Sequence, residues 1–385
     1  MQVLWEGAEA SILSTLAFAP MAILSMQNRI DEMARKAGFD AAGIAAVPAP
    51  GSAEDREERG RFIDWVDAGR AGEMEYLKRR DEAGALVRSS LRVALPWARS
   101  VIVCAANYNS AEPRSTDPAP HGTAWIARYA WTGSGDRPSD YHKVLLRKLE
   151  NLRDRLAEEM SAFESRCFVD TGPVVERVYA RYAGIGWVGK NTCILNQQLG
   201  SWLFLGVIVT SLELPEDQLT LPAADRCGSC TRCIDACPTN ALTAPHQMDA
   251  SRCIAYLTIE KRGEIPEDLR ADMGRQVFGC DICQDVCPWN RRAPASADPD
   301  LAPRKPLVNP PLDWLAEIDE AQFGRWFNGS PVRRAKWGGL RRNLAIAMGN
   351  SGQQRFLPIL GQWSADTDPV VADAARWAIQ SLRRN

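Results

Sequence analysis

The chain has 385 residues and a formal net charge of −2, with 45% hydrophobic and 24% charged residues. This is the composition of a folded globular protein, and it excludes a disordered chain, a collagen and a coiled coil. The near-neutral balance also argues against a protein that coats nucleic acid by bulk charge, and no apolar run is long enough to predict a membrane-spanning helix.

The N-terminal segment 1–25 contains an apolar run over 12–24. The charges that precede this run are acidic, whereas a secretory signal has basic residues there, so export is not expected. We predict that 1–25 is a poorly ordered extension or a misassigned start, and that Met26 opens an amphipathic helix over 27–37 that Gly38 closes.

From there to about residue 215, helical and strand patterns alternate. The apolar spacing predicts helices over 56–70, 141–160 and 174–183, and strands over 41–47, 100–106, 167–170 and 203–210. The alternation predicts an α/β or α+β domain over 26–215.

The rest of the chain divides into two further regions. Short turns and cysteines fill 216–295, six prolines in 291–311 predict a wrapped linker, and helical patterns return at 343–348, 356–360 and 370–382. The expected fold is therefore α+β, with the α/β domain at 26–215, a cysteine-rich domain at 216–295, and a linker with a HEAT-like helical domain at 296–385.

Eight of the eleven cysteines lie within 227–287. The first four have the spacing Cys-x2-Cys-x2-Cys-x3-Cys-Pro, which is the bacterial ferredoxin run for a [4Fe–4S] cluster. A second run, at 280, 283 and 287, has the same spacing without the first cysteine. Together with the cysteine at 253, these thiols are enough for two clusters in a ferredoxin-like domain.

In two-cluster ferredoxins the cysteine before proline binds the other cluster. We therefore assign cluster one to Cys227, Cys230, Cys233 and Cys287, and cluster two to Cys237, Cys253, Cys280 and Cys283. A pair of zinc sites is the alternative, although zinc rarely uses three cysteines in such a row. The remaining thiols, Cys104, Cys167 and Cys193, are expected to be structural.

Asp170 follows the predicted strand at 167–170, before the turn Thr171-Gly172-Pro173. A carboxylate at a strand end is a candidate site residue, and its structural alternative is the N-cap of the next helix. The following stretch, 184–192, is rich in glycine but departs from both a Walker A loop and a dinucleotide fingerprint. We expect its backbone to approach a large cofactor or ligand closely.

These residues together resemble the epoxyqueuosine reductase family. The resemblance is carried by the eight cysteines and by VDTGPVVER (169–177), GIGWVGKN (184–191), GSWLFLG (200–206), CIAYLTIE (253–260) and DICQDVCPWN (281–290). It covers about 26–385. The stretch 132–139 is longer than the family pattern.

The resemblance implies an oxidoreductase that reduces epoxyqueuosine to queuosine at the tRNA wobble position, with cobalamin reduced through the two clusters. It makes Asp170 the proton donor, and it implies cobalamin contacts at Met74, Tyr76, Asn196, Ile254, Lys261 and Asp281. The corrinoid motif Asp-x-His-x-x-Gly is absent, because Leu145 stands where glycine is needed after His142. Base-off binding without a histidine ligand is therefore expected.

A basic segment lies near the C-terminus. Between 325 and 342 there are six basic and no acidic residues, with Trp326, Phe327 and Trp337 among them. Cations bind phosphates and aromatic rings stack on splayed bases, so the segment is a candidate RNA-binding surface. The predicted tRNA contacts are Arg325, Arg333, Arg334, Lys336, Arg341 and Arg342, and a solvated helix surface is the alternative.

The expected protein is a cytoplasmic monomer that receives electrons from a low-potential donor of the flavodoxin or ferredoxin type. Three rival functions use the same features: a reductive dehalogenase, a plain electron carrier, and a cluster-stabilised RNA-binding protein without chemistry. The missing twin-arginine signal argues against the first. Bound cobalt would exclude the plain electron carrier, and turnover on tRNA would exclude the RNA-binding protein without chemistry.

Overall fold

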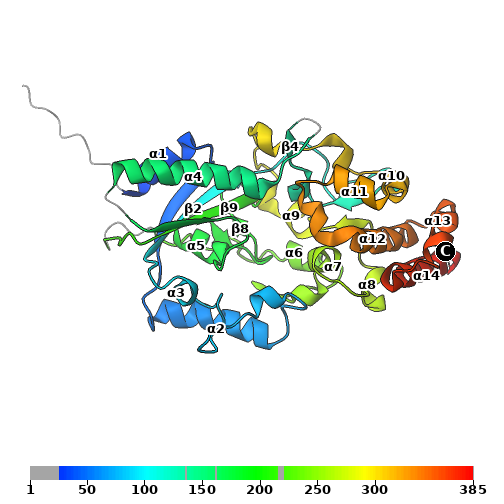
Figure 1. Ribbon diagram of the computed structural model, residues 1–385, viewed down its shortest axis with the longest axis horizontal. Coiled ribbons are helices and arrows are strands. Elements are labelled where there is room, and N and C mark those ends of the chain that lie inside the picture. Colours follow the sequence, from blue (N-terminus) through cyan, green and yellow to red (C-terminus); the bar gives the residue numbers. More distant parts are fainter. Residues whose placement is uncertain (1–25, 135–136, 161–162, 216–220, 385) are drawn as a thin grey trace, which may run out of the picture.

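The computed structural model describes residues 26–134, 137–160, 163–215 and 221–384 (Figure 1). The predicted extension at 1–25, and positions 135–136 of the long stretch at 132–139, lie outside these residues. The sheet lies toward one end of the molecule, the C-terminal helices lie at the other, and the cysteine-rich region lies between them. Over the described residues, no helix has the length and apolar character needed to cross a membrane.

The N-terminal domain is built on one sheet of four strands, β1 (Ala41–Ala46), β2 (Ser100–Asn107), β6 (Ser165–Phe168) and β9 (Leu203–Thr210). Their order is β1-β2-β9-β6, and every neighbouring pair is antiparallel. All four predicted strands are confirmed. The helix–strand alternation nevertheless does not produce a parallel sheet, so the domain is α+β rather than α/β.

Both faces of this sheet are covered, which explains why the central strand β2 is buried at every position. The even-numbered side chains Ile102, Cys104 and Ala106 pack against α1 (Met26–Lys36) and α4 (Tyr141–Glu159). The odd-numbered side chains from Val101 to Ala105 pack against α3 (Leu91–Ala94) and α5 (Glu176–Tyr182). Alternate residues of a strand point to opposite faces, so a continuous apolar run is what a strand between two helical layers requires.

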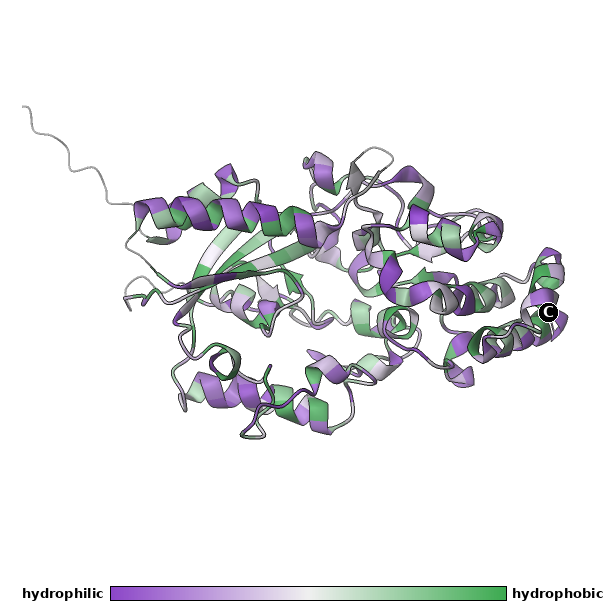
Figure 2. Cartoon of the chain, viewed as in Figure 1, coloured by the Kyte–Doolittle hydropathy of each residue, from purple (hydrophilic) through white to green (hydrophobic). Residues whose placement is uncertain are grey.

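The sequence shows this layering in its hydropathy. Figure 2 colours β2 and β9 mainly as hydrophobic, whereas α4 mixes hydrophilic and hydrophobic residues along its length. Gly43 in β1 allows α5 to approach closely, because a Cβ at this position would lie 2.0 Å from the carbonyl oxygen of Ala183. A further helix, α2 (Ala53–Asp67), is capped by Ser52, and its Trp65 indole donates to the carbonyl of Met248 in the cysteine-rich region.

The cysteine-rich region consists of short elements: α6 (Arg232–Asp235), β10 (Leu242–Ala244), β11 (Gln247–Met248), α7 (Ile254–Ile259), α8 (Glu267–Arg270), β12 (Gln276–Phe278) and α9 (Ile282–Asp285). Strand β12 pairs in parallel with β3 (Trp125–Ile126). Residues 124–131 fall inside the predicted N-terminal domain, but they pack into the core that the C-terminal helices form.

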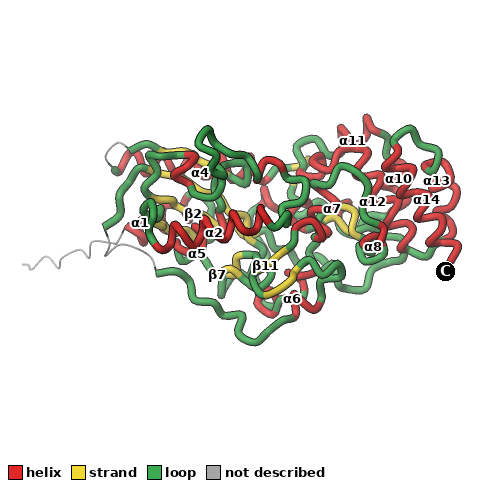
Figure 3. The backbone as a smooth tube through the Cα atoms, turned by 90° about the horizontal axis from the view of Figure 1, so that it is seen from below, coloured by secondary structure: helices red, strands yellow, loops and turns green. Residues whose placement is uncertain are grey.

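The C-terminal region is helical, as predicted, with α10 (Leu312–Glu317), α11 (Glu320–Trp326), α12 (Lys336–Asn350), α13 (Leu357–Trp363) and α14 (Pro369–Arg384). Figure 3 shows these helices gathered at one end of the molecule. Asn343 in α12 donates to the carbonyls of Thr258 and Val277, so the helices are joined to the cysteine-rich region by buried hydrogen bonds.

Other short elements complete the chain. They are the strands β4 (Gly133–Ser134), β5 (Arg137–Pro138), β7 (Trp187–Val188) and β8 (Ile194–Leu195), and the 3-10 helices at Glu75–Leu77, Arg128–Trp131, Ala250–Arg252, Pro288–Asn290, Pro299–Leu301, Lys305–Leu307, Pro331–Ala335 and Gln354–Phe356.

Candidate functional site

Asp170 lies just after β6, with a left-handed φ of +53°. Its carboxylate Oδ2 accepts a hydrogen bond of 3.0 Å from the Tyr141 hydroxyl, and His142 Nε2 lies 3.9 Å from the same oxygen. The N-cap alternative is wrong, because α5 begins at Glu176 with Val175 as its N-cap. The carboxylate therefore remains open to a ligand, with a side chain that is 64% exposed.

Tyr141 is fixed by packing. Its ring stacks on Phe204 at a centroid distance of 4.2 Å and on His142 at 4.0 Å. Burial and the nearby Asp170 charge raise the pKa of Tyr141 well above its usual value, so the phenol keeps its proton and remains a donor. Sequence reasoning missed this contact, because it treated His142 and its neighbours only as the start of an ordinary helix.

Glu176 adds a second carboxyl group beside Asp170. Its Oε1 accepts a hydrogen bond of 3.2 Å from the backbone N–H of Asp170. Burial, together with the Asp170 charge, raises the pKa of Glu176 to about 7. The site therefore pairs an open carboxylate with a buried carboxyl group that holds its proton near neutral pH.

On the other side of Asp170 lies an exposed aromatic ring with cations on it. Tyr76 is 44% exposed, and the guanidinium groups of Arg88 and Arg334 lie 5.5 and 5.6 Å from its ring centroid. Arg334 also forms an ion pair of 2.6 Å with Glu260. The Asp170 charge is among the charges that shift the pKa values of Tyr76 and Arg334, which indicates that these side chains lie near Asp170.

The predicted cobalamin contacts divide into two sets. Met74 and Lys261 lie with Tyr76 near this space: the Met74 sulfur accepts from the Tyr76 hydroxyl, and Lys261 pairs with Glu73. For the other three, the side chains of Ile254 and Asp281 are each 2% exposed, and the partly exposed amide of Asn196 is bonded within its own loop. Asp281 accepts from the Trp125 indole and the Arg128 backbone. Contact of these three residues with cobalamin stays a prediction.

The eight cysteines at 227–287 separate into two neighbourhoods, and all of them are free thiols. Burial and the charges of Cys227 and Cys233 raise the pKa of Cys287, and burial and the charges of Cys227 and Cys230 raise the pKa of Cys233. Besides burial, the charge of Cys237 raises the pKa values of Cys253 and Cys280, and the charge of Cys253 contributes to the raised pKa values of Cys280 and Cys283. Cys193 acts on members of both groups, and the crossed assignment stays a prediction.

The glycine-rich stretch at 184–192 does not open toward a ligand. Its glycines allow the chain to fold on itself, because a Cβ at Gly186 would lie 2.2 Å from the carbonyl oxygen of Leu195. Its polar groups contact the cysteine loops instead: Lys190 donates to the carbonyl of Gly228, and Asn191 donates to that of Cys283. The expected close approach to a large cofactor is therefore a close approach to the protein's own chain.

The basic segment at 325–342 is only partly a surface. Arg325, Arg333 and Lys336 are exposed, and none of them forms an ion pair within the described part of the chain. Two predicted contacts are corrected. Arg342 is 1% exposed and donates to the carbonyls of Leu257, Lys261 and Gly263, whereas Arg341 pairs with Asp366 between Trp337 and Trp363.

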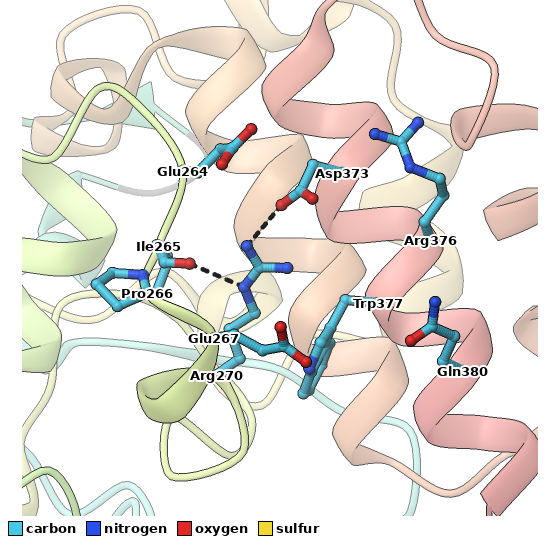
Figure 4. A pocket seen from close by; sticks show the side chains of 9 residues that line it. All are labelled: Glu264, Ile265, Pro266, Glu267, Arg270, Asp373, Arg376, Trp377 and Gln380. Atoms are coloured by element: carbon cyan, nitrogen blue, oxygen red, sulfur yellow. Dashed lines mark hydrogen bonds and ion pairs between the residues drawn. The ribbon is translucent and has the colours of Figure 1, made fainter.

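Two cavities lie elsewhere. One of about 430 Å³ is lined by α8 and α14 and contains the Arg270–Asp373 ion pair of 2.5 Å (Figure 4). The other, of about 500 Å³, lies against the loop 109–118, Arg128 and Trp202. Neither is lined by Asp170 or by a cysteine, so neither belongs to the site around Asp170.

Comparisons with known proteins agree with this geometry. A family model described as a 4Fe-4S double cluster binding domain matches residues 226–290, which replaces the zinc alternative with iron–sulfur clusters. A model described as epoxyqueuosine reductase QueG, DUF1730, matches residues 88–171.

Full-length relatives extend the match. An epoxyqueuosine reductase of Xanthomonas campestris is 39% identical over 354 residues, covering 91% of this chain and 94% of the relative. One from Pseudomonas aeruginosa is 37% identical over 365 residues, covering 92% of this chain and 94% of the relative.

Solved structures agree as well. A crystal structure of epoxyqueuosine reductase with an epoxyqueuosine-modified tRNA-Tyr stem loop aligns with a TM-score of 0.78 at 31% identity, over 92% of this chain and 89% of that one. The epoxyqueuosine reductase of Streptococcus thermophilus aligns with a TM-score of 0.78 at 26% identity, over 94% of this chain and 91% of that one. Taken with the full-length relatives, these matches show that the chain belongs to the epoxyqueuosine reductase family.

Proposed function

We propose that this protein reduces epoxyqueuosine to queuosine at the wobble position of tRNA anticodons, the last step of queuosine biosynthesis. One observation carries the proposal beyond family membership. Arg334, from the basic segment, lies on the Tyr76 ring and within the field of Asp170. A phosphate-binding surface and a candidate proton donor therefore meet at one place, as a tRNA-modifying enzyme requires.

The cysteines would hold two [4Fe–4S] clusters. Cys227, Cys230, Cys233 and Cys287 would bind the first, and Cys237, Cys253, Cys280 and Cys283 the second. The fit rests on eight free thiols in two neighbourhoods, and on backbone N–H groups aimed at sulfur, such as that of Ala241, 3.3 Å from Cys237 Sγ. No disulfide competes for these thiols in the described chain.

Cobalamin would lie between the N-terminal domain and the cysteine-rich domain, against Met74, Tyr76 and Lys261. An exposed aromatic ring beside a catalytic carboxylate suits a large planar cofactor. When bound, cobalamin supplies the low-potential cobalt centre on which the epoxide is reduced. We expect no histidine ligand, because the Asp-x-His-x-x-Gly motif is absent: Leu145 stands where glycine is needed.

Removal of the epoxide oxygen as water takes two electrons and two protons. Asp170 would deliver a proton to the departing oxygen, since its carboxyl group is open to the substrate. Tyr141 would hold that group in position through its hydroxyl. Arg325, Arg333, Arg334 and Lys336 would bind tRNA phosphates, with electrons arriving from a flavodoxin- or ferredoxin-type donor to a monomer in the cytoplasm.

The test is direct. Anaerobically purified protein with both clusters and added cobalamin is incubated with epoxyqueuosine-containing tRNA and a strong reductant, and the digested nucleoside is weighed. Loss of one oxygen is expected. An unchanged nucleoside with all cofactors bound would refute the proposed reaction, and failure to bind cobalamin would favour an electron carrier.

A further inference from the structure

The hairpin at 184–195 crosses both cysteine neighbourhoods. Its strands β7 and β8 pair with Trp187 opposite Leu195. Figure 3 shows β7 close to β11 and α6, and the backbone N–H of His246, next to β11, donates to the carbonyl of Lys190. No other function is assigned to this glycine-rich segment, although it contacts the loops that carry both sets of ligands.

The first contact joins Trp187 to Cys227. The indole Nε1 donates to Cys227 Sγ over 3.4 Å. The ring is held for this contact, because Trp187 is 3% exposed and lies edge-on to Trp289 at a centroid distance of 4.9 Å. Cys287, the proposed fourth ligand of the same cluster, belongs to the same small apolar core.

A second contact lies further along the hairpin, between Asn191 and the loop of Cys283. Asn191 is 4% exposed; its Oδ1 accepts from the backbone N–H of Cys193, and its Nδ2 donates to the carbonyl of Cys283 over 3.4 Å. This contact reaches the backbone of the second cysteine loop and not a ligand sulfur, so it holds the hairpin in place without donating to a ligand.

A donor hydrogen bond to a ligand sulfur favours the reduced, more negative form of a cluster and raises its reduction potential. Of the two contacts, only that of Trp187 reaches a ligand sulfur. We propose that Trp187 raises the reduction potential of the first cluster by donating a hydrogen bond to Cys227 Sγ. The inference rests on the proposed cluster ligation, and it makes Trp187 a positioning residue for electron delivery.

The hairpin's other polar groups exclude the phosphate-loop alternative. The Lys190 ammonium is used by the carbonyl of Gly228, and the Gly189 N–H is used by the carbonyl of Cys193. A loop that binds phosphate needs free backbone N–H groups and a free lysine. Here both are bonded within the protein, so neither is free for phosphate, and the hairpin's Trp187 N–H donates to sulfur instead.

The test is a potentiometric titration followed by electron paramagnetic resonance, on protein that holds both clusters without cobalamin or tRNA. Trp187→Phe keeps an aromatic ring but removes the N–H. The midpoint of the first cluster is expected to shift to a more negative potential, and that of the second cluster to stay unchanged.

Trp65→Phe is the matched control, because it removes an indole N–H that donates to the carbonyl of Met248 and not to a sulfur, and it should shift neither midpoint. Unchanged midpoints in W187F with full iron content would overturn the proposal, as would equal shifts of both clusters. If W187F does not assemble its cluster, the wild type is measured by electron–nuclear double resonance in D2O. No exchangeable proton near the first cluster would then overturn the proposal. Because no substrate is used, these outcomes are independent of whether epoxyqueuosine is reduced.

Discussion

The hydroxyl of Tyr141 donates a 3.0 Å hydrogen bond to Oδ2 of Asp170, across the gap between the start of α4 and the end of β6. The two residues are far apart in sequence but meet because α4 covers the sheet that β6 borders. Removal of this bond by Tyr141→Phe keeps the stack on Phe204. One hydrogen bond contributes about 1 kcal/mol, so turnover should fall about five- to tenfold with little change in KM. Single-turnover rates on modified tRNA measure this, and an unchanged rate would show that Asp170 needs no such support.

Replacement of Asp170 itself should have a larger effect. Asp170→Asn preserves the shape of the side chain and removes the proton that it delivers. General acid catalysis typically contributes 10²- to 10⁴-fold, so turnover should fall by at least about a hundredfold, with cobalamin and tRNA affinity kept. Rapid-quench assays together with binding titrations separate the two quantities. Full activity of D170N would disprove the proton-donor role.

The basic segment predicts a salt effect. Arg333→Ala with Lys336→Ala should weaken tRNA binding, because both cations are exposed and none of the described acidic groups pairs with them. Each lost phosphate contact should reduce the slope of log affinity against log salt by about 0.7–0.9. Filter binding at several salt concentrations gives this slope, and an unchanged slope would remove the pair from the interface.

Arg342→Ala is the contrasting change in the same segment. Arg342 is buried and donates to three carbonyl groups that no water reaches easily. The loss should destabilise the protein by about 3 kcal/mol and lower its thermal midpoint, with the salt slope of the surviving folded protein unchanged. Wild-type stability of this variant would mean that the carbonyls find other donors.

Glu176 predicts a pH dependence of stability. Burial and the Asp170 charge raise its pKa in the folded state from about 4.5, its ordinary value, to about 7. The folded state therefore holds this proton more tightly, and the stability gained is present below about pH 4.5 and lost as pH rises through 7. Glu176→Gln cannot ionise, so it should differ little from the wild type at pH 5 and exceed it by about 3 kcal/mol at pH 8.

Thermal midpoints of both proteins at matched cluster content, measured between pH 5 and 8.5, check this expectation. A pH-independent difference would contradict it. Glu58→Gln is a suitable control, because Glu58 is a carboxylate elsewhere on the N-terminal domain that is bonded to the Tyr182 hydroxyl.

Local patterns in the sequence determined the elements and the cysteine chemistry. The apolar runs at β2 and β9 predicted buried strands, and leucines at helical spacing predicted α4, because periodicity reports which faces are buried. The cysteine spacing predicted two iron–sulfur clusters, which the match to a double-cluster domain confirms, because ligands close in sequence must bind within a short loop.

Contacts between distant segments were decided only by the tertiary structure. Strand direction depends on connections that periodicity does not encode, so the antiparallel order β1-β2-β9-β6 had to be observed. Arg341 and Arg342 read as part of a basic surface in one dimension, but burial depends on what α12 packs against, here α7 and α14. For the same reason the motif around Asp170 predicted where this carboxylate lies in the chain but not which side chain it contacts. Tyr141 reaches that carboxylate, and Trp187 reaches Cys227, because packing brings together side chains whose separation along the chain carries no signal.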